Sequence, residues 1–176
     1  MRRIIEKIKA GYRLTYNQKK QEQFVWEELK KLFDESKLDA YIDNELKFLS
    51  SKFKIGNGFV LVYYNIRNGY FSCDVDIIEN YPEEDTTELF ILTTHFNNFL
   101  KHGIILVNVH EQNVTYRLKK EIIMPLLRPE IIHKWVRVHL YTLRDLQSYY
   151  LKLIQEKESP ALIIADAINK IRKDAA

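Results

Sequence analysis

Polar and apolar residues alternate along two stretches of the chain, and this pattern predicts two β-hairpins. Over residues 70–78 every second side chain is apolar, which is typical of a strand with one buried and one wet face. Asn68-Gly69 stands just before this stretch and favours a type I′ turn from a strand over residues 59–65. A second hairpin is predicted from residues 104–109 and 114–118.

Elsewhere apolar residues recur every three or four positions, which predicts helices. The first covers residues 19–36, the second carries an apolar stripe over residues 89–100, and a long one covers residues 129–157. A final helix begins at Pro160. Residues 40–53 fit a strand and the end of a helix equally well.

Residues that favour helix ends support these boundaries. Ser159 followed by Pro160 is typical of a helix start. Asp85 is predicted to cap the helix over residues 89–100, and Gly103 is predicted to end it. The apolar face of the final helix is predicted to consist of Leu162, Ala165, Ile168 and Ile171.

These elements together predict the fold class. Hairpins imply a mostly antiparallel sheet, and amphipathic helices bury their apolar faces against it. We therefore expect a two-layer α+β fold, in which a sheet built from two hairpins packs on helices and a helical extension follows. Three parts are expected: a basic N-terminal arm or short helix over residues 1–18, a single α+β domain over residues 19–157, and a C-terminal helix over residues 158–176 that packs on the domain.

Composition places the chain among folded proteins of a reducing compartment. Of its 176 residues, 46% are hydrophobic and 29% are charged, as in ordinary globular proteins. Cys73 is the only cysteine, so no internal disulfide can form, which favours the cytosol. The apolar runs are too short to cross a bilayer. We therefore expect a cytoplasmic protein.

The formal net charge of +3 is small, but the charges lie in blocks. Basic residues dominate residues 1–20 and 117–144, whereas acidic residues dominate residues 74–90. Such blocks predict two differently charged surfaces. Solvated faces that segregate without a partner are the alternative.

The residue types that catalysis and metal binding use form no known motif. The five histidines fit no His-Glu-x-x-His pattern, and no Cys-x-x-Cys occurs. His95 and His102 are predicted to share one helix face. Cys73 is predicted to be a buried, inert core residue, because the neighbouring Asp74 and Asp76 disfavour a thiolate. We expect no catalytic residue, no cofactor and no metal; an unrecognised enzyme site that uses the two aspartates is an alternative.

The long predicted helix carries more apolar residues than one face can hold, so either the terminal helix or another subunit is expected to cover a second side. Trp135 and Tyr150 are the predicted anchors for a protein partner, because aromatic residues dominate interface energies. Lys134, Arg137 and Arg144 share one side of this helix, where they could contact the phosphates of a nucleic acid.

The order of elements over residues 19–157 resembles the fold of type III secretion chaperones and of YbjN-like proteins. The two hairpins, the helix over residues 89–100 and the helix over residues 129–157 carry the resemblance. It implies a small, cytoplasmic, non-enzymatic and often dimeric protein. The resemblance transfers no functional residue to this chain.

The sequence thus favours a non-enzymatic cytoplasmic protein-binding domain. Such a domain would act as a chaperone-like or regulatory adaptor, and its partner would be another protein or a second copy in a homodimer. Strand edges and aromatic side chains would hold an extended polypeptide. The alternatives are a nucleic-acid-associated protein that uses the basic arm and the basic side of the long helix, and an enzyme with an unrecognised site.

Overall fold

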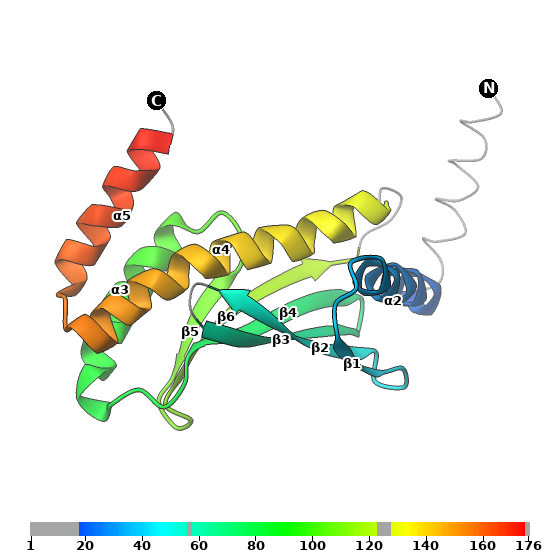
Figure 1. Ribbon diagram of the computed structural model, residues 1–176, viewed down its shortest axis with the longest axis horizontal. Helices are drawn as coiled ribbons and strands as arrows, with labels where there is room; N and C mark the ends of the chain where they lie inside the picture. The colour runs from blue at the N-terminus through cyan, green and yellow to red at the C-terminus, as the bar shows by residue number, and fades with distance from the viewer. Residues whose placement is uncertain (1–17, 56–57, 123–127, 175–176) are drawn as a thin grey trace. The chain divides into compact units, whose positions relative to one another are not determined.

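The structure is a computed structural model that describes residues 18–55, 58–122 and 128–174, with side chains described up to Lys170. The predicted N-terminal arm lies outside the described residues, apart from Gln18. Helices and strands follow one another along the described chain (Figure 1) as α2 (Gln18–Glu35), β1 (Ala40–Asp43), β2 (Phe48–Ile55), β3 (Gly58–Arg67), β4 (Tyr70–Ile78), the short 3₁₀ helix η1 (Glu83–Asp85), α3 (Thr86–Phe99), β5 (Ile104–Asn108), β6 (Asn113–Glu121), α4 (Pro129–Glu156) and α5 (Pro160–Asp174).

The strands form a six-stranded sheet in the order β1-β2-β3-β4-β6-β5. The pairs β1–β2, β2–β3 and β5–β6 are antiparallel. The chain forms two compact units: unit 1 comprises the described residues of Met1–Asp74 and Leu118–His139, and unit 2 those of Val75–Arg117 and Leu140–Ala176. The prediction of an α+β fold with a mostly antiparallel sheet and a C-terminal helical region is confirmed.

In unit 1 the inner face of the sheet packs against α2. Alternate residues of β3 from Val60 to Ile66 are buried, as their period of two requires. The α2 stripe that includes Leu29 and Phe33 is also buried, and the Phe33 and Tyr64 ring centroids lie 5.4 Å apart. The aromatic edge-to-face contact and the burial together hold the helix on this face.

The turns of unit 1 explain which part of the sheet was predictable. Asn68 and Gly69 have φ of 54° and 77°, so the predicted type I′ turn is confirmed. The ambiguous stretch over residues 40–53 is a further hairpin, β1–β2. The Asp43 carboxylate holds its turn by accepting the backbone N–H groups of Glu45 and Leu46, both at 2.9 Å.

In unit 2 the predicted hairpin is observed as β5–β6, with Asn108 opposite Asn113. The apolar stripe of α3 is buried at Leu89, Leu92 and Phe96. The predicted face of α5 is wrong: Leu162 is 60% exposed, whereas Ile163 and Ala167 are buried. These two positions form an i, i+4 pair, so the buried stripe is rotated from the predicted one.

Two predicted helix ends also differ. The Asp85 side chain makes no capping bond; its carboxylate accepts two hydrogen bonds from Lys157 Nζ, at 2.7 and 2.9 Å. A charged partner from a distant part of the chain thus replaces the local cap. Helix α3 ends at Phe99 with Leu100 as its C-cap, so Gly103 does not end the helix. Gly103 instead adopts a φ of 80° in the loop before β5.

Candidate functional site

The outer face of the sheet in unit 1 presents side chains that α2 does not bury. On β2 this face carries Phe48, Ser50, Lys52 and Lys54, all half-buried or exposed. On β3 it carries Phe59, Leu61, Tyr63 and Asn65, also half-buried or exposed. The strand alternation that sends Val62 and Tyr64 into the core places these residues on the opposite surface.

Three aromatic side chains form a row across this face, which we call the aromatic ribbon: Tyr41 of β1, Phe48 of β2 and Tyr63 of β3. The ring centroids of Tyr41 and Phe48 are 6.4 Å apart, and those of Phe48 and Tyr63 are 6.0 Å apart in a stacked arrangement. Tyr41 is 65% exposed. Neighbouring aromatic groups on three strands, of which Tyr41 is exposed and Phe48 and Tyr63 are half-buried, are typical of an interaction surface rather than of scattered surface residues.

The ribbon ends at β1, which is an outer strand of the sheet. The Lys47 carbonyl accepts a hydrogen bond from the Ile66 N–H at 3.2 Å, so the odd-numbered residues of β2, which follow Lys47, direct their main-chain groups toward β3. By the alternation of antiparallel pairs, the main-chain groups of Ile42, opposite Leu49, point away from β2. Unit 1 therefore offers main-chain hydrogen bonds beside the exposed Tyr41.

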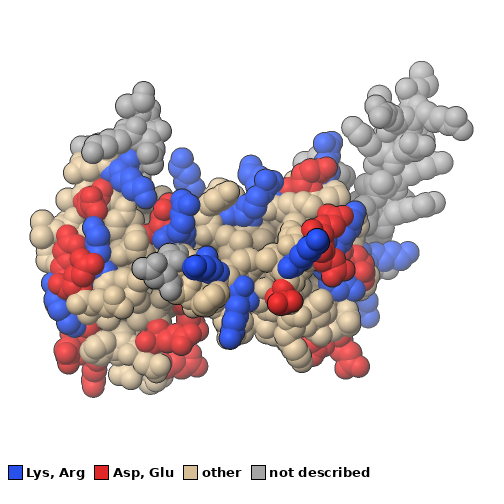
Figure 2. All heavy atoms as spheres, in the orientation of Figure 1, with Lys and Arg blue, Asp and Glu red and all other residues tan. Residues whose placement is uncertain are grey.

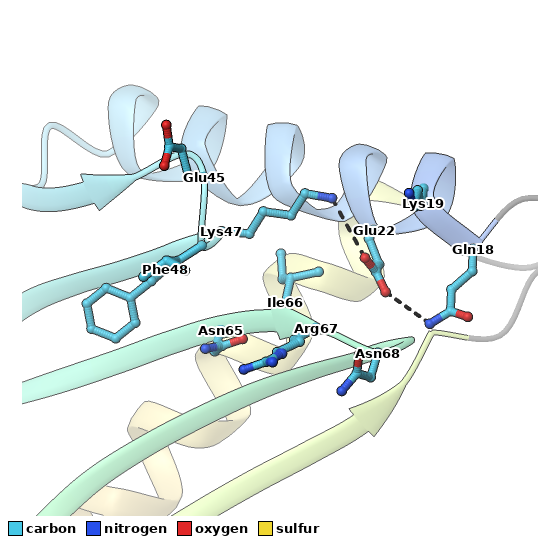
Figure 3. A pocket seen from close by; sticks show the side chains of 11 residues that line it. Gln18, Lys19, Glu22, Glu45, Lys47, Phe48, Asn65, Ile66, Arg67 and Asn68 are labelled. Carbon is cyan, nitrogen blue, oxygen red and sulfur yellow. Dashed lines mark hydrogen bonds and ion pairs between the residues drawn. The ribbon is translucent and has the colours of Figure 1, made fainter.

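A cleft of about 550 Å³ in unit 1 lies beside the ribbon, between the start of α2, the β1–β2 turn and the end of β3. Figure 3 shows its lining, with the Phe48 ring at one side. Glu22 is a half-buried acid of this cleft: it forms an ion pair with Lys47 at 3.8 Å and accepts hydrogen bonds from the side-chain amide of Gln18 at 3.1 Å and from the backbone N–H of Gly69 at 2.7 Å. The carboxylate thus joins a helix to two turns.

We expect Glu22→Gln to lower the free energy of unfolding by about 1–2 kcal/mol, because the hydrogen bond from the Gly69 N–H loses its charge assistance and the ion pair with Lys47, which is of low exposure, is lost. Urea denaturation of purified protein measures this change. Glu27→Gln is the matched control, since Glu27 is 54% exposed and pairs with Lys30 on the surface. Its effect should stay under about 0.5 kcal/mol. Equal losses in the two variants would contradict the role given to Glu22.

The structure places all five predicted partner-binding residues on α4, three in unit 1 and two in unit 2. In unit 1, Trp135 is half-buried with its ring 5.4 Å from that of Phe71, while Lys134 and Arg137 are exposed. In unit 2, Arg144 is exposed, forms an ion pair with Asp145 at 3.7 Å and lies 5.7 Å from the Tyr141 ring. On the face that Figure 2 displays, basic and acidic side chains are mixed.

Tyr150, which is predicted as an anchor for a protein partner, is a core residue of unit 2. The side chain is fully buried in unit 2, and its hydroxyl is hydrogen-bonded to the Thr93 hydroxyl at 2.6 Å. Burial raises the pKa of this phenol well above its ordinary value, while the bond to Thr93 opposes the rise. Tyr141, which is 61% exposed, occupies the opposite side of α4.

Cys73 is buried, as predicted. Burial is the larger cause and the charge of Asp74 the smaller cause that raise the pKa of its thiol, which disfavours a nucleophilic thiolate. Asp76 accepts a hydrogen bond from the Thr115 hydroxyl at 2.6 Å. His102 lies beyond the end of α3, so the predicted shared helix face with His95 is wrong. Within the described residues, no three His, Cys, Asp or Glu side chains are grouped for a metal ion.

The aromatic ribbon is not among the features predicted from the sequence. Residues 59–63 carry a signal for it, because Phe59, Leu61 and Tyr63 are apolar at the positions that alternate with the buried ones. Tyr41 and Phe48 lie in the stretch that the pattern could not assign, and only the strand register brings them beside Tyr63.

No protein-family model matches the chain, and no curated protein matches its sequence. A solved structure does share the fold. YbjN, a proposed transcription regulator from E. coli, matches with a TM-score of 0.54 and 9% sequence identity, over 68% of this chain and 85% of that chain. At this identity the similarity shows the fold alone, and it confirms the resemblance to the YbjN-like fold. Among the described helices, none has the length and apolar character to span a membrane.

Proposed function

We propose that the chain is a non-enzymatic, cytoplasmic protein-binding domain that acts as a chaperone-like or regulatory adaptor. The observation that carries the proposal is the aromatic ribbon on the outer sheet face of unit 1. Its partner is an extended segment of another protein that lies across Tyr41, Phe48 and Tyr63. The description of YbjN as a proposed transcription regulator supports the regulatory form of this function.

The surroundings of the ribbon favour a polypeptide. The outward main-chain groups of β1 can pair with an added strand, while exposed aromatic rings bind its side chains. Asp39, Asp43 and Glu45 flank this edge and favour a segment with basic residues.

The proposal includes self-association as a homodimer. Exposed apolar side chains of unit 2 support it, because Phe90 and Ile91 of α3 are 45% and 46% exposed. A nucleic-acid-associated function is the second candidate, and the exposed Lys134 and Arg137 of α4 favour it. Its binding would weaken steeply with added salt.

The test is affinity capture of the tagged protein from its native cells, in which we compare the wild type with a Tyr41→Ser, Phe48→Ser variant. We expect the variant to recover the wild-type partner proteins at a level reduced at least about tenfold, because aromatic hot spots contribute about 2 kcal/mol or more each. Quantitative mass spectrometry measures the recovery, and circular dichroism checks that the variant is folded.

Tyr141→Ser is the matched control, since Tyr141 is an equally exposed tyrosine that lies outside the ribbon. It should leave the recovery unchanged. Partners that the double variant retains in full would refute the proposed function. Material that disappears after nuclease treatment would instead favour the second candidate.

A further inference from the structure

Strand β5 ends the sheet order in unit 2 and has no charged residue or proline to protect its edge. Ile104 is 46% exposed and Leu106 is 36% exposed on its outer face. An apolar edge strand of this kind is a template for pairing with another chain, and natural proteins block such edges. The structure of unit 2 shows how this edge is blocked.

The side-chain amide of Asn97, in the last turns of α3, occupies the place of a neighbouring strand. Its Nδ2 donates to the Ile105 carbonyl at 2.9 Å, and its Oδ1 accepts the Ile105 N–H at 2.8 Å. A paired strand residue makes the same two bonds. The Leu100 N–H donates to the Phe96 carbonyl at 2.9 Å, which holds the end of α3 that carries Asn97.

These bonds show which residues of β5 direct their main-chain groups away from β6. Both main-chain groups of Ile105 are hydrogen-bonded to Asn97, so the N–H and C=O of Ile105 point away from β6. In an antiparallel pair the direction of the main-chain groups alternates from residue to residue. The N–H and C=O of Val107 therefore also point away from β6, whereas those of Ile104 and Leu106 point toward their partners Arg117 and Thr115 in β6. Ile105 and Val107 are therefore the two residues through which β5 would pair with an added strand.

We propose that β5 is a latent pairing edge of unit 2 that Asn97 keeps closed, and that its occupant, once the amide is removed, is β5 of a second copy of the chain. This inference concerns a different unit from the proposed function and goes beyond it. Asn97 acts as an autoinhibitory contact: its two bonds occupy the main-chain groups of Ile105, one of the two residues through which a second copy would pair.

The strand is complementary to itself in an antiparallel arrangement. With Leu106 at the centre, Ile105 of each copy lies opposite Val107 of the other, so the outward main-chain groups meet. Lys101 and Glu111 lie near opposite ends of the strand and are exposed. Antiparallel copies therefore bring opposite charges together at both ends, and no like charges face each other within the strand.

The test is the assembly state of Asn97→Ala, measured by sedimentation equilibrium against the wild type. We expect the mass of the variant to rise to at least twice that of the wild type as concentration increases. Amide hydrogen exchange gives the second readout: the Val107 N–H should exchange slowly in the assembled variant and rapidly in the wild type. Adding Val107→Pro, which removes the outward N–H and leaves the ladder to β6, should restore the wild-type mass.

A folded Asn97→Ala variant that keeps the wild-type mass would overturn the proposal. Association that persists with Val107→Pro, or that leaves the Val107 N–H in fast exchange, would also overturn it, because the contact would then use another surface. If thermal melting shows that Asn97→Ala is unfolded, Asn97→Asp carries the same test. The aspartate still accepts the Ile105 N–H but no longer donates to the carbonyl, so we expect association that Val107→Pro again reverses.

Discussion

The Tyr150→Ala variant is expected to lose about 4 kcal/mol of unfolding free energy, since truncating a fully buried aromatic side chain leaves a large cavity. The Tyr150 ring packs beside Phe96, with centroids 6.0 Å apart, and its hydroxyl pairs with Thr93. Removing the ring also leaves the buried Thr93 hydroxyl without this partner, which adds to the loss. Urea denaturation followed by circular dichroism measures the change.

Two further variants separate packing from hydrogen bonding and from surface effects. Tyr150→Phe keeps the ring and loses the hydroxyl, so about 1–2 kcal/mol is expected. Tyr141→Ala, on the exposed side of the same helix, should change stability by less than about 0.5 kcal/mol. If Tyr150→Ala were as stable as the wild type and yet lost its protein partners, Tyr150 would be an interface anchor and not a core residue.

Replacing Gly103 with alanine is expected to cost about 3 kcal/mol in unit 2. The residue has a φ of 80°, where a side chain adds strain. An added Cβ would lie 2.5 Å from the Tyr116 ring and 2.7 Å from the Arg117 carbonyl oxygen, so the backbone or the buried ring must move. The Tyr116 hydroxyl donates to the His102 carbonyl at 2.9 Å, and this bond would be disturbed as well.

Gly58→Ala is the matched control for Gly103, since the nearest atom of the described residues to its added Cβ is the Ile55 carbonyl oxygen at 4.0 Å. Its effect should stay within about 1 kcal/mol, because a glycine in a strand carries no specific contact to lose. Chemical denaturation of both variants gives the comparison. Equal stabilities for the two would show that the loop before β5 can relax around a side chain, which would contradict the close packing of Gly103 against Tyr116.

Local signals predicted most of the fold. The Asn68-Gly69 turn, the alternation over residues 70–78 and the Ser159-Pro160 helix start depend on neighbours in the sequence, and the structure places them as predicted. The β1–β2 hairpin escaped prediction because its turn has no Asn-Gly pair. Its conformation depends on the Asp43 carboxylate and on a φ of 49° at Lys47.

The errors arose where distant residues decide the outcome. The Asp85 carboxylate is bound by Lys157, which lies 72 positions later in the sequence, and it therefore does not cap α3 as predicted. The buried stripe of α5 consists of Ile163 and Ala167, because its contact with α3 selects one of several apolar faces. A helical period shows that a face is apolar, but it does not show which neighbour covers that face.

The candidate site was harder to predict than the fold. Tyr150 follows the buried Leu143 and Leu146 at helical spacing, and Tyr141 lies on the other side of α4. The helical period thus separates the two tyrosines, but it does not show that α3 covers Tyr150. The aromatic ribbon combines residues from three strands, so its existence depends on the register that pairs Tyr41 with Ser50 and Ser50 with Tyr63. The register is set by the geometry of the turns, and the sequence predicts the turn type of only one hairpin in unit 1.

The most direct test of the proposed function is photo-crosslinking from the ribbon in native cells, with a benzophenone amino acid in place of Tyr41. The account predicts adducts to polypeptides that resist nuclease and disappear when Phe48→Ser is added, whereas the same group in place of Tyr141 should give none of them. The absence of protein adducts at position 41, or identical adducts from both positions, would contradict the claim that this face binds a protein partner.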